Sequence, residues 1–151
     1  MYPVASSVPF VVPLLVVLLA TGCHSAAGPT RERVVGTIAA GMSSTAALES
    51  PVTALAGEPV TVTVTTVGSS SCTAAAGAEV IYRGAVVEIT PYDWTAAPET
   101  ACSRDMHPFP RRVTVRFPTM GTFTLRVTGR ALTGELGGAV VEAPITVVGP
   151  D

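Results

Sequence analysis

The sequence predicts an all-β domain, an antiparallel β-sandwich of about seven short strands. Val, Thr and Ile, which suit half-buried pleated strands, make up 47 of the 151 residues, and Gly and Pro, which suit turns, make up another 27. Several short segments alternate apolar and polar side chains with a period of two, and turn residues separate them. Short strands at regular spacing are typical of an antiparallel sandwich.

The first half of the domain contains one clear strand and one hairpin. Residues 33–39 and 52–55 are weaker strand candidates, whereas residues 60–65 alternate Val with Thr throughout. Segments 80–82 and 85–90 flank an Arg-Gly pair, which predicts a hairpin with a tight turn. The one candidate helix, residues 43–49, is too short to change the fold class.

The second half predicts a hairpin and a terminal strand. Segments 113–117 and 123–127 alternate strictly on either side of Pro118-Thr119-Met120-Gly121, and this is the best hairpin pattern in the chain. A last strand is expected over residues 139–148. Pro144 within it marks a bulge or an edge position, because proline cannot donate to a ladder.

The composition excludes several kinds of function. The chain contains no Lys, Asn or Gln, so Schiff-base chemistry and a Walker-type phosphate loop are excluded. A formal net charge of −2 and the absence of a basic run argue against nucleic acid as a partner. With two His and few acids, we expect neither a metal nor another cofactor, and we expect no enzymatic activity.

The N-terminus indicates export. Residues 8–20 are apolar but interrupted by two prolines, and they are shorter than the roughly twenty residues that span a bilayer. The end of this segment and the three residues after it, Leu19-Ala20-Thr21-Gly22-Cys23, resemble the lipobox of bacterial lipoproteins. That resemblance implies cleavage after Gly22 and attachment of diacylglycerol, with acyl chains such as palmitate, to Cys23. The alternative is an ordinary signal peptide in which Cys23 is incidental.

These features divide the chain into a signal peptide (1–22), a tether rich in Ser, Ala, Gly and Pro (23–33) and one domain (34–151). With Cys23 assigned to lipid, Cys72 and Cys102 remain and are expected to form a disulfide in an oxidising compartment. Free thiols and intermolecular pairing are the alternatives. His24 stands where the lipoprotein family's inner-membrane retention signal has Asp, which implies the outer membrane if the cell has one.

A second resemblance concerns the domain. Gly57-Glu58-Pro59-Val60-Thr61-Val62 and Met120-Gly121-Thr122-Phe123-Thr124-Leu125-Arg126-Val127 are similar to strand entries in bacterial immunoglobulin-like domains. The resemblance implies an immunoglobulin-like β-sandwich for residues 34–151.

Residues 91–110 are predicted to form a long loop, because they contain four prolines and follow the last alternating segment of the first hairpin. We expect the aromatic side chains of this loop to cover one end of the core, as is common in small domains. The alternative is a partner-binding patch formed by Tyr92, Trp94, Arg104 and Phe109, since Tyr, Trp and Arg are enriched at binding hot spots.

The same segment contains residue types that occur in catalytic triads and in copper sites. Ser103 and His107 lie near two aspartates, but no strained elbow or Gly-rich oxyanion segment accompanies them. A blue-copper site would combine Cys102, Met106 and His107, yet it needs a second His in the domain and a free thiol. We therefore predict neither.

The expected protein is an exported envelope lipoprotein, anchored in a bacterial membrane on its periplasmic or cell-surface face. Its expected role is structural or interactive, with the membrane and a protein of the envelope as partners. The alternative is a secreted or tethered ligand-binding module, such as a protease inhibitor on an immunoglobulin-like scaffold.

Overall fold

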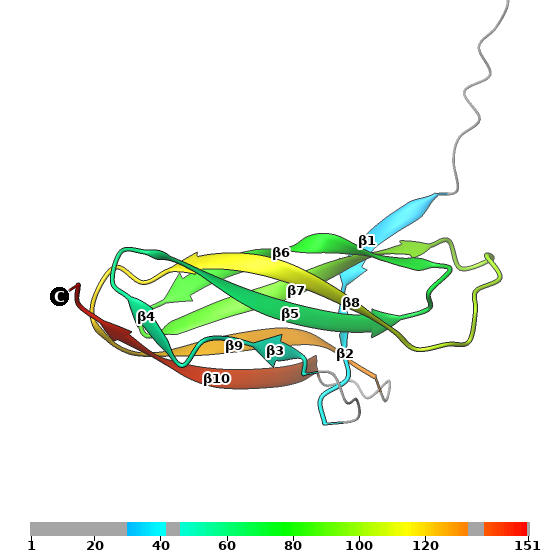
Figure 1. Ribbon diagram of the computed structural model, residues 1–151. Helices are drawn as coiled ribbons and strands as arrows, with labels where there is room; N and C mark the ends of the chain where they lie inside the picture. Colours follow the sequence, from blue (N-terminus) through cyan, green and yellow to red (C-terminus); the bar gives the residue numbers. More distant parts are fainter. Residues whose placement is uncertain (1–29, 42–45, 133–137, 151) are drawn as a thin grey trace, which may run out of the picture.

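The computed structural model describes residues 30–41, 46–132 and 138–150 (Figure 1). Across these residues the chain is all-β and has no helix, hence none that is long and apolar enough to cross a membrane. The expected signal peptide, Cys23 and most of the expected tether lie outside the described residues. The strands are β1 (Arg31–Val35), β2 (Thr37–Ile38), β3 (Leu48–Glu49), β4 (Thr53–Leu55), β5 (Pro59–Gly68), β6 (Thr73–Arg83), β7 (Val86–Ala96), β8 (His107–Arg116), β9 (Gly121–Ala131) and β10 (Gly138–Val148).

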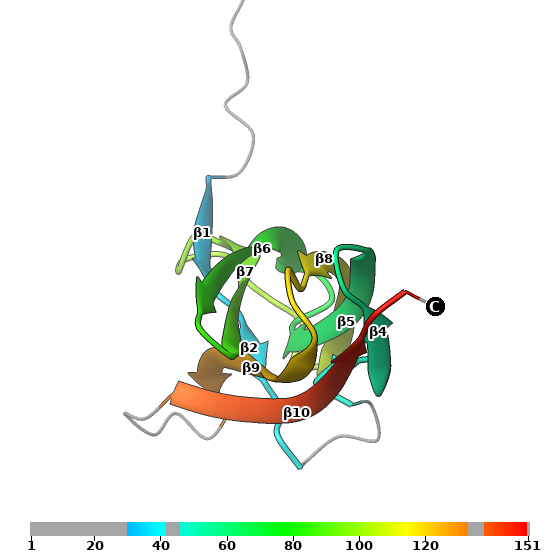
Figure 2. The same cartoon turned by 90° about the vertical axis from the view of Figure 1, so that its left-hand side faces the viewer.

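The long strands lie on two sides of one core (Figures 1 and 2). On one side, β5 and β8 pair antiparallel along ten residues each, and the short β3 adds to β5. On the other side, hydrogen-bonded neighbours follow the order β6, β7, β9, β10, and β4 adds to the end of β10. Strand β2 pairs with both β5 and β9, and it joins the two sides into one ten-stranded sheet.

The pairing is mixed, so the prediction of an antiparallel sheet holds only in part. Strand β9 runs parallel to β7 and to β2, and β4 runs parallel to β10. The β7–β9 pair has a topological cause. After β7 the chain crosses to the other side to form β8 and then returns, so β9 enters beside β7 in the same direction.

Of the two predicted hairpins, one is confirmed and the other is wrong. Strands β6 and β7 form a hairpin that turns at Gly84, whose φ of 61° suits a residue without a Cβ. Strands β8 and β9 are not paired with each other, because β8 pairs with β5 and β9 pairs with β7 and β10. Residues 117–120 therefore carry the chain between the two sides of the core. The helix prediction over 43–49 fails at Leu48 and Glu49, which form β3, and residues 43–45 lie outside the described part.

The predicted loop 91–110 is largely strand, because β7 continues to Ala96 and β8 begins at His107. Pro91 fits in β7 because it stands opposite Ala78, beside a bulge in β6 where the ladder is interrupted. Pro144 lies on β10 in uninterrupted register with β9, so of the two predicted positions it occupies an edge rather than a bulge.

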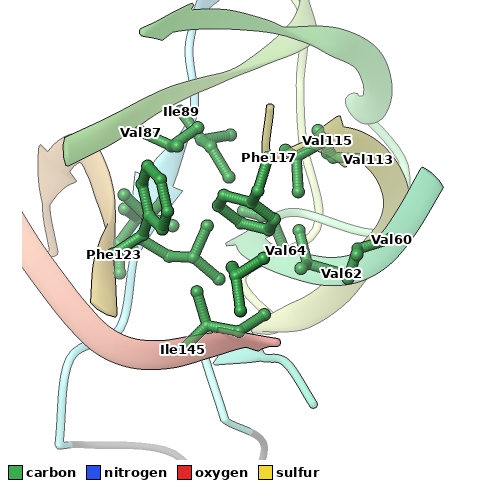
Figure 3. Close-up of a cluster of buried hydrophobic side chains, with 14 residues drawn as sticks. Val60, Val62, Val64, Val87, Ile89, Val113, Val115, Phe117, Phe123 and Ile145 are labelled. Atoms are coloured by element: carbon green, nitrogen blue, oxygen red, sulfur yellow. The ribbon is translucent and has the colours of Figure 1, made fainter. Parts of the chain in front are cut away.

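The core lies between β5 and β8 on one side and β7, β9 and β10 on the other (Figure 3). The aromatic rings of Phe117 and Phe123, with centroids 4.9 Å apart, pack against each other within this core, beside the connection between β8 and β9. Each fully buried Val, Leu, Ile or Phe side chain contributes roughly 1.5–3 kcal/mol relative to an exposed one. The buried cluster comprises Ile38, Val60, Val62, Val64, Val87, Ile89, Val113, Val115, Phe117, Phe123, Leu125, Val127, Ile145 and Val147.

Candidate functional site

The two ends of the domain differ in chemistry, and one end is fastened by a disulfide. Strand pairing brings the end of β5 beside the start of β8, and the start of β6 beside the end of β7. There a disulfide links Cys72 to Cys102, with their Cα atoms 5.6 Å apart, in agreement with the pairing expected from the sequence. It ties the turn at residues 69–72 to the loop at residues 97–106, which we call the disulfide end.

Hydrogen bonds reinforce that tie. A carboxylate oxygen of Asp105 accepts from the backbone N–H of Ser70 at 3.1 Å and from the Ser103 hydroxyl. The backbone N–H of Ser103 donates to the Ser71 hydroxyl at 2.9 Å. Hydrogen bonds from Ser103 and then Ser70 lower the pKa of Asp105 to about 2, because they stabilise its ionised form. The loop is thus fastened by a carboxylate as well as by a covalent bond.

Beneath this end lies a buried ion pair that the sequence analysis missed. Arg111 of β8 and Asp93 of β7 are 8% and 2% exposed, and their Nη2 and Oδ1 atoms are 2.5 Å apart. The hydroxyl of Thr66, on β5, donates to the same carboxylate at 2.9 Å and also contacts Arg111. Three strands from both sides of the core therefore meet at one charged cluster, hereafter the buried ion pair.

The remaining polar contacts of the guanidinium are to the backbone. Nη1 of Arg111 donates to the carbonyl oxygen of Gly77 at 3.0 Å and to that of Tyr92, whereas Nε has no hydrogen-bond partner among the described residues. The chain between β1 and β2 packs directly on this cluster. A Cβ at Gly36 would lie 2.5 Å from a Thr66 methyl group and 2.8 Å from an Asp93 oxygen. The cluster is closed off from solvent, so its geometry suits a structural clamp.

The structure separates the four residues of the predicted patch. Tyr92 and Trp94 alternate with buried Asp93, so they lie on the outer face of β7 rather than in a loop. Phe109 lies on β8 in the same register as buried Arg111, half-buried and packed edge-on against His107 with ring centroids 5.2 Å apart. Arg104 is exposed in the loop that follows Cys102. The four residues therefore do not lie together in one loop, and partner binding by them stays a prediction.

Of the catalytic candidates, Ser103 and Asp105 are hydrogen-bonded to each other, whereas Asp93 and His107 have other partners. Ser103 bonds to neighbouring serines and Asp105, Asp93 bonds to Arg111, and the imidazole of His107 packs on Phe109. Within the described residues, no group of three or more His, Cys, Asp or Glu side chains could hold a metal ion.

On the outer face of the sheet beside β1, the side chains of Arg33 and Tyr92 are held by specific contacts. The Arg33 guanidinium lies 3.7 Å above the centre of the Tyr92 ring, and its Nε donates to the carbonyl oxygen of Ala76 at 3.3 Å. The Tyr92 hydroxyl donates to Glu79 at 3.2 Å. Trp94 stands directly opposite Arg33 in the β1–β7 pair and is 39% exposed.

The opposite end of the domain carries open apolar grooves. One groove of about 460 Å³ lies between β4, the start of β5 and the end of β10, and a second of about 440 Å³ is lined by Tyr82, Phe123 and Pro118. Met120 beside them is 69% exposed. The described residues thus offer an aromatic and cationic face near β1 and apolar grooves far from it. No family model, no curated protein and no solved structure matches this chain.

Proposed function

We propose that the chain is a bacterial envelope lipoprotein, anchored through Cys23, whose domain has a non-enzymatic interaction or structural role. The observation that carries this proposal is the disulfide between Cys72 and Cys102. Such bonds persist in exported proteins and are rare in the reducing cytosol. Cys23 is the third cysteine of the sequence, and it stands directly after the apolar segment and the small residues of a lipobox-like sequence.

We also propose that the domain is an immunoglobulin-like sandwich. The pairing of β5 with β8, which have two strands between them in sequence, supports this assignment, as does the β9–β10 hairpin on the other side of the core. The alternation along β5, β8 and β9 turns apolar side chains inward from both sides. The parallel β7–β9 pair is the main departure from that architecture.

The structural character of the buried groups supports a non-enzymatic role. The buried ion pair is enclosed by the domain and leaves neither of its charged groups open to a substrate. The exposed features are instead surfaces: the aromatic face beside β1 and the grooves at the opposite end.

The anchor is tested by metabolic labelling with an alkyne analogue of palmitate, followed by membrane fractionation. The parent protein is expected to be labelled and to sediment with membranes. Cys23→Ser is expected to lose the label and to leave the membrane fraction, because the thiolate that receives the lipid is gone. Cys72→Ser serves as the matched control and is expected to keep the label. Labelling of Cys23→Ser at the parent level would contradict the proposal.

A further inference from the structure

The outer face of β1 and the paired end of β7 presents two aromatic and two cationic side chains, Arg31, Arg33, Tyr92 and Trp94, which we call the β1 face. Arg33 pairs with Trp94, and Arg31 pairs with Ala96, so the side chains at these alternate positions share one side of the sheet. Trp94 is the only tryptophan in the sequence, and it is 39% exposed although neighbouring Asp93 is buried.

The β1 face is held in shape before any partner arrives. Arg33 is fixed between the Tyr92 ring and the Ala76 carbonyl oxygen, and Tyr92 is fixed by Glu79. On the inner side of the same strand, Asp93 is bound by Arg111. A surface that is already rigid loses little conformational entropy on contact, so even a few side chains can stabilise the contact with a partner.

The sequence places this face close to the proposed anchor. Thr30, the first described residue, is seven residues after Cys23, and seven residues span at most about 25 Å. Strand β1 begins at the next residue, whereas the turn at Gly84 lies at the far end of the eleven-residue β7. Eleven strand residues extend about 36 Å, so the opposite end lies well beyond the β1 face.

We propose that the β1 face lies against the membrane surface, with the Trp94 ring at the level of the lipid headgroups and Arg31 and Arg33 directed at lipid phosphates. Tryptophan and tyrosine favour the membrane–water interface, because their rings are apolar and their N–H or O–H group is polar. Arginine binds phosphate oxygens through charge-assisted hydrogen bonds. The inference rests on the lipid anchor proposed above.

Net charge does not drive this contact. Glu79 lies beside Tyr92 on this face, whereas Glu32 alternates to the other side of β1, so the two arginines and Glu79 leave the β1 face only weakly positive. The recognised chemistry is the phosphate and the interfacial layer that zwitterionic and anionic lipids share. Contact is therefore expected in vesicles of phosphatidylcholine alone, and it should depend only weakly on salt.

The test uses the full mature lipidated protein in phosphatidylcholine vesicles with brominated acyl chains, which quench tryptophan fluorescence on contact. Trp94 emission is expected to fall by about half relative to unbrominated vesicles, since the ring sits at the interface. The matched control is the double variant Trp94→Phe with Met120→Trp, which moves the one tryptophan to an exposed position at the opposite end. Its emission is expected to be unchanged by bromination.

Equal Trp94 emission in both kinds of vesicle would overturn the inference, and so would equal quenching of the Met120→Trp control. Failure of the anchor is recognised separately. If the mass of the purified protein shows no acyl chains, the proposed function fails; if the chains are present and Trp94 is not quenched, only the orientation fails.

Discussion

Arg33 and Arg111 bind consecutive carbonyl oxygens in strand β6, those of Ala76 and Gly77, one from the exposed side and the other from the buried side. The two carbonyls lie within the bulge that shifts the β6–β7 register between Ala75 and Ala78. A bulge leaves ladder groups unpaired, and here side chains from β1 and β8 take their place. This irregularity therefore links the outer β1 face to the buried ion pair.

Replacement of Arg111 by Met is expected to lower the free energy of unfolding by about 3–5 kcal/mol, because it leaves Asp93 as an uncompensated buried charge. Arg112→Met, at the exposed neighbouring position, is expected to change it by less than about 0.5 kcal/mol. Urea unfolding measures both values. The double variant Asp93→Leu with Arg111→Met is expected to recover much of the loss, since an apolar pair needs no compensation. A loss of unfolding free energy under about 1 kcal/mol for Arg111→Met would contradict a structural role for the buried ion pair.

Removal of the disulfide is expected to destabilise the domain. The double variant Cys72→Ser with Cys102→Ser lacks the covalent link between two residues 30 positions apart. On the loop-entropy model its free energy of unfolding is lower by roughly 3–4 kcal/mol. Thermal unfolding of the oxidised parent, the reduced parent and the double variant provides the measurement. The reduced parent and the variant should agree. Cys23→Ser is the control and should leave the transition unchanged.

Stability is expected to fall in acid because of Asp105. Its pKa is about 2 in the folded protein, against the ordinary value of 3.8, so the folded state binds this proton less readily than the unfolded state. The resulting stabilisation is fully present above about pH 4 and disappears as the pH falls to about 2. Between about pH 2 and 5, the slope of melting temperature against pH should be shallower for Asp105→Asn than for the parent protein. The same is expected of Ser103→Ala, which removes the main hydrogen bond. Identical slopes in all three proteins would exclude this cause.

Two isoleucines on paired strands test the assignment of the inner face. Ile89→Val removes a methyl group from a fully buried side chain of β7 and is expected to cost about 0.5–1.5 kcal/mol. Ile81→Val, on β6 and 39% exposed, should have a much smaller effect. Chemical unfolding of both variants compares them directly. A larger effect at Ile81 would mean that Ile81, and not Ile89, lies on the buried face of this hairpin.

The all-β class and most strand positions could be predicted because period-two alternation reports which side chains are buried. Alternation does not report which strand is the partner. Segments 113–117 and 123–127 alternate equally well, yet β8 pairs with β5 and β9 pairs with β7 and β10. The choice between a hairpin and a crossover depends on packing of both sides of the core, which local sequence does not contain.

The buried ion pair was missed for a related reason. Asp93 continues the inward register of Val87 and Ile89, and Arg111 continues that of Val113 and Val115, so a signal was present. Pro91 ended the first predicted strand before Asp93, and the second predicted strand began only at Val113, two residues after Arg111. In the structure Pro91 lies beside the β6 bulge, which makes the missing N–H tolerable.

The most direct test of the central claim is the intact mass of the protein purified from its host's membrane fraction, measured before and after reduction. The account predicts a chain that begins at Cys23, carries diacylglycerol and acyl chains, and gains two hydrogen atoms on reduction of the bond between Cys72 and Cys102. A chain without lipid, cleaved elsewhere or retaining its N-terminus, would contradict the anchor and leave Cys23 without the role proposed for it.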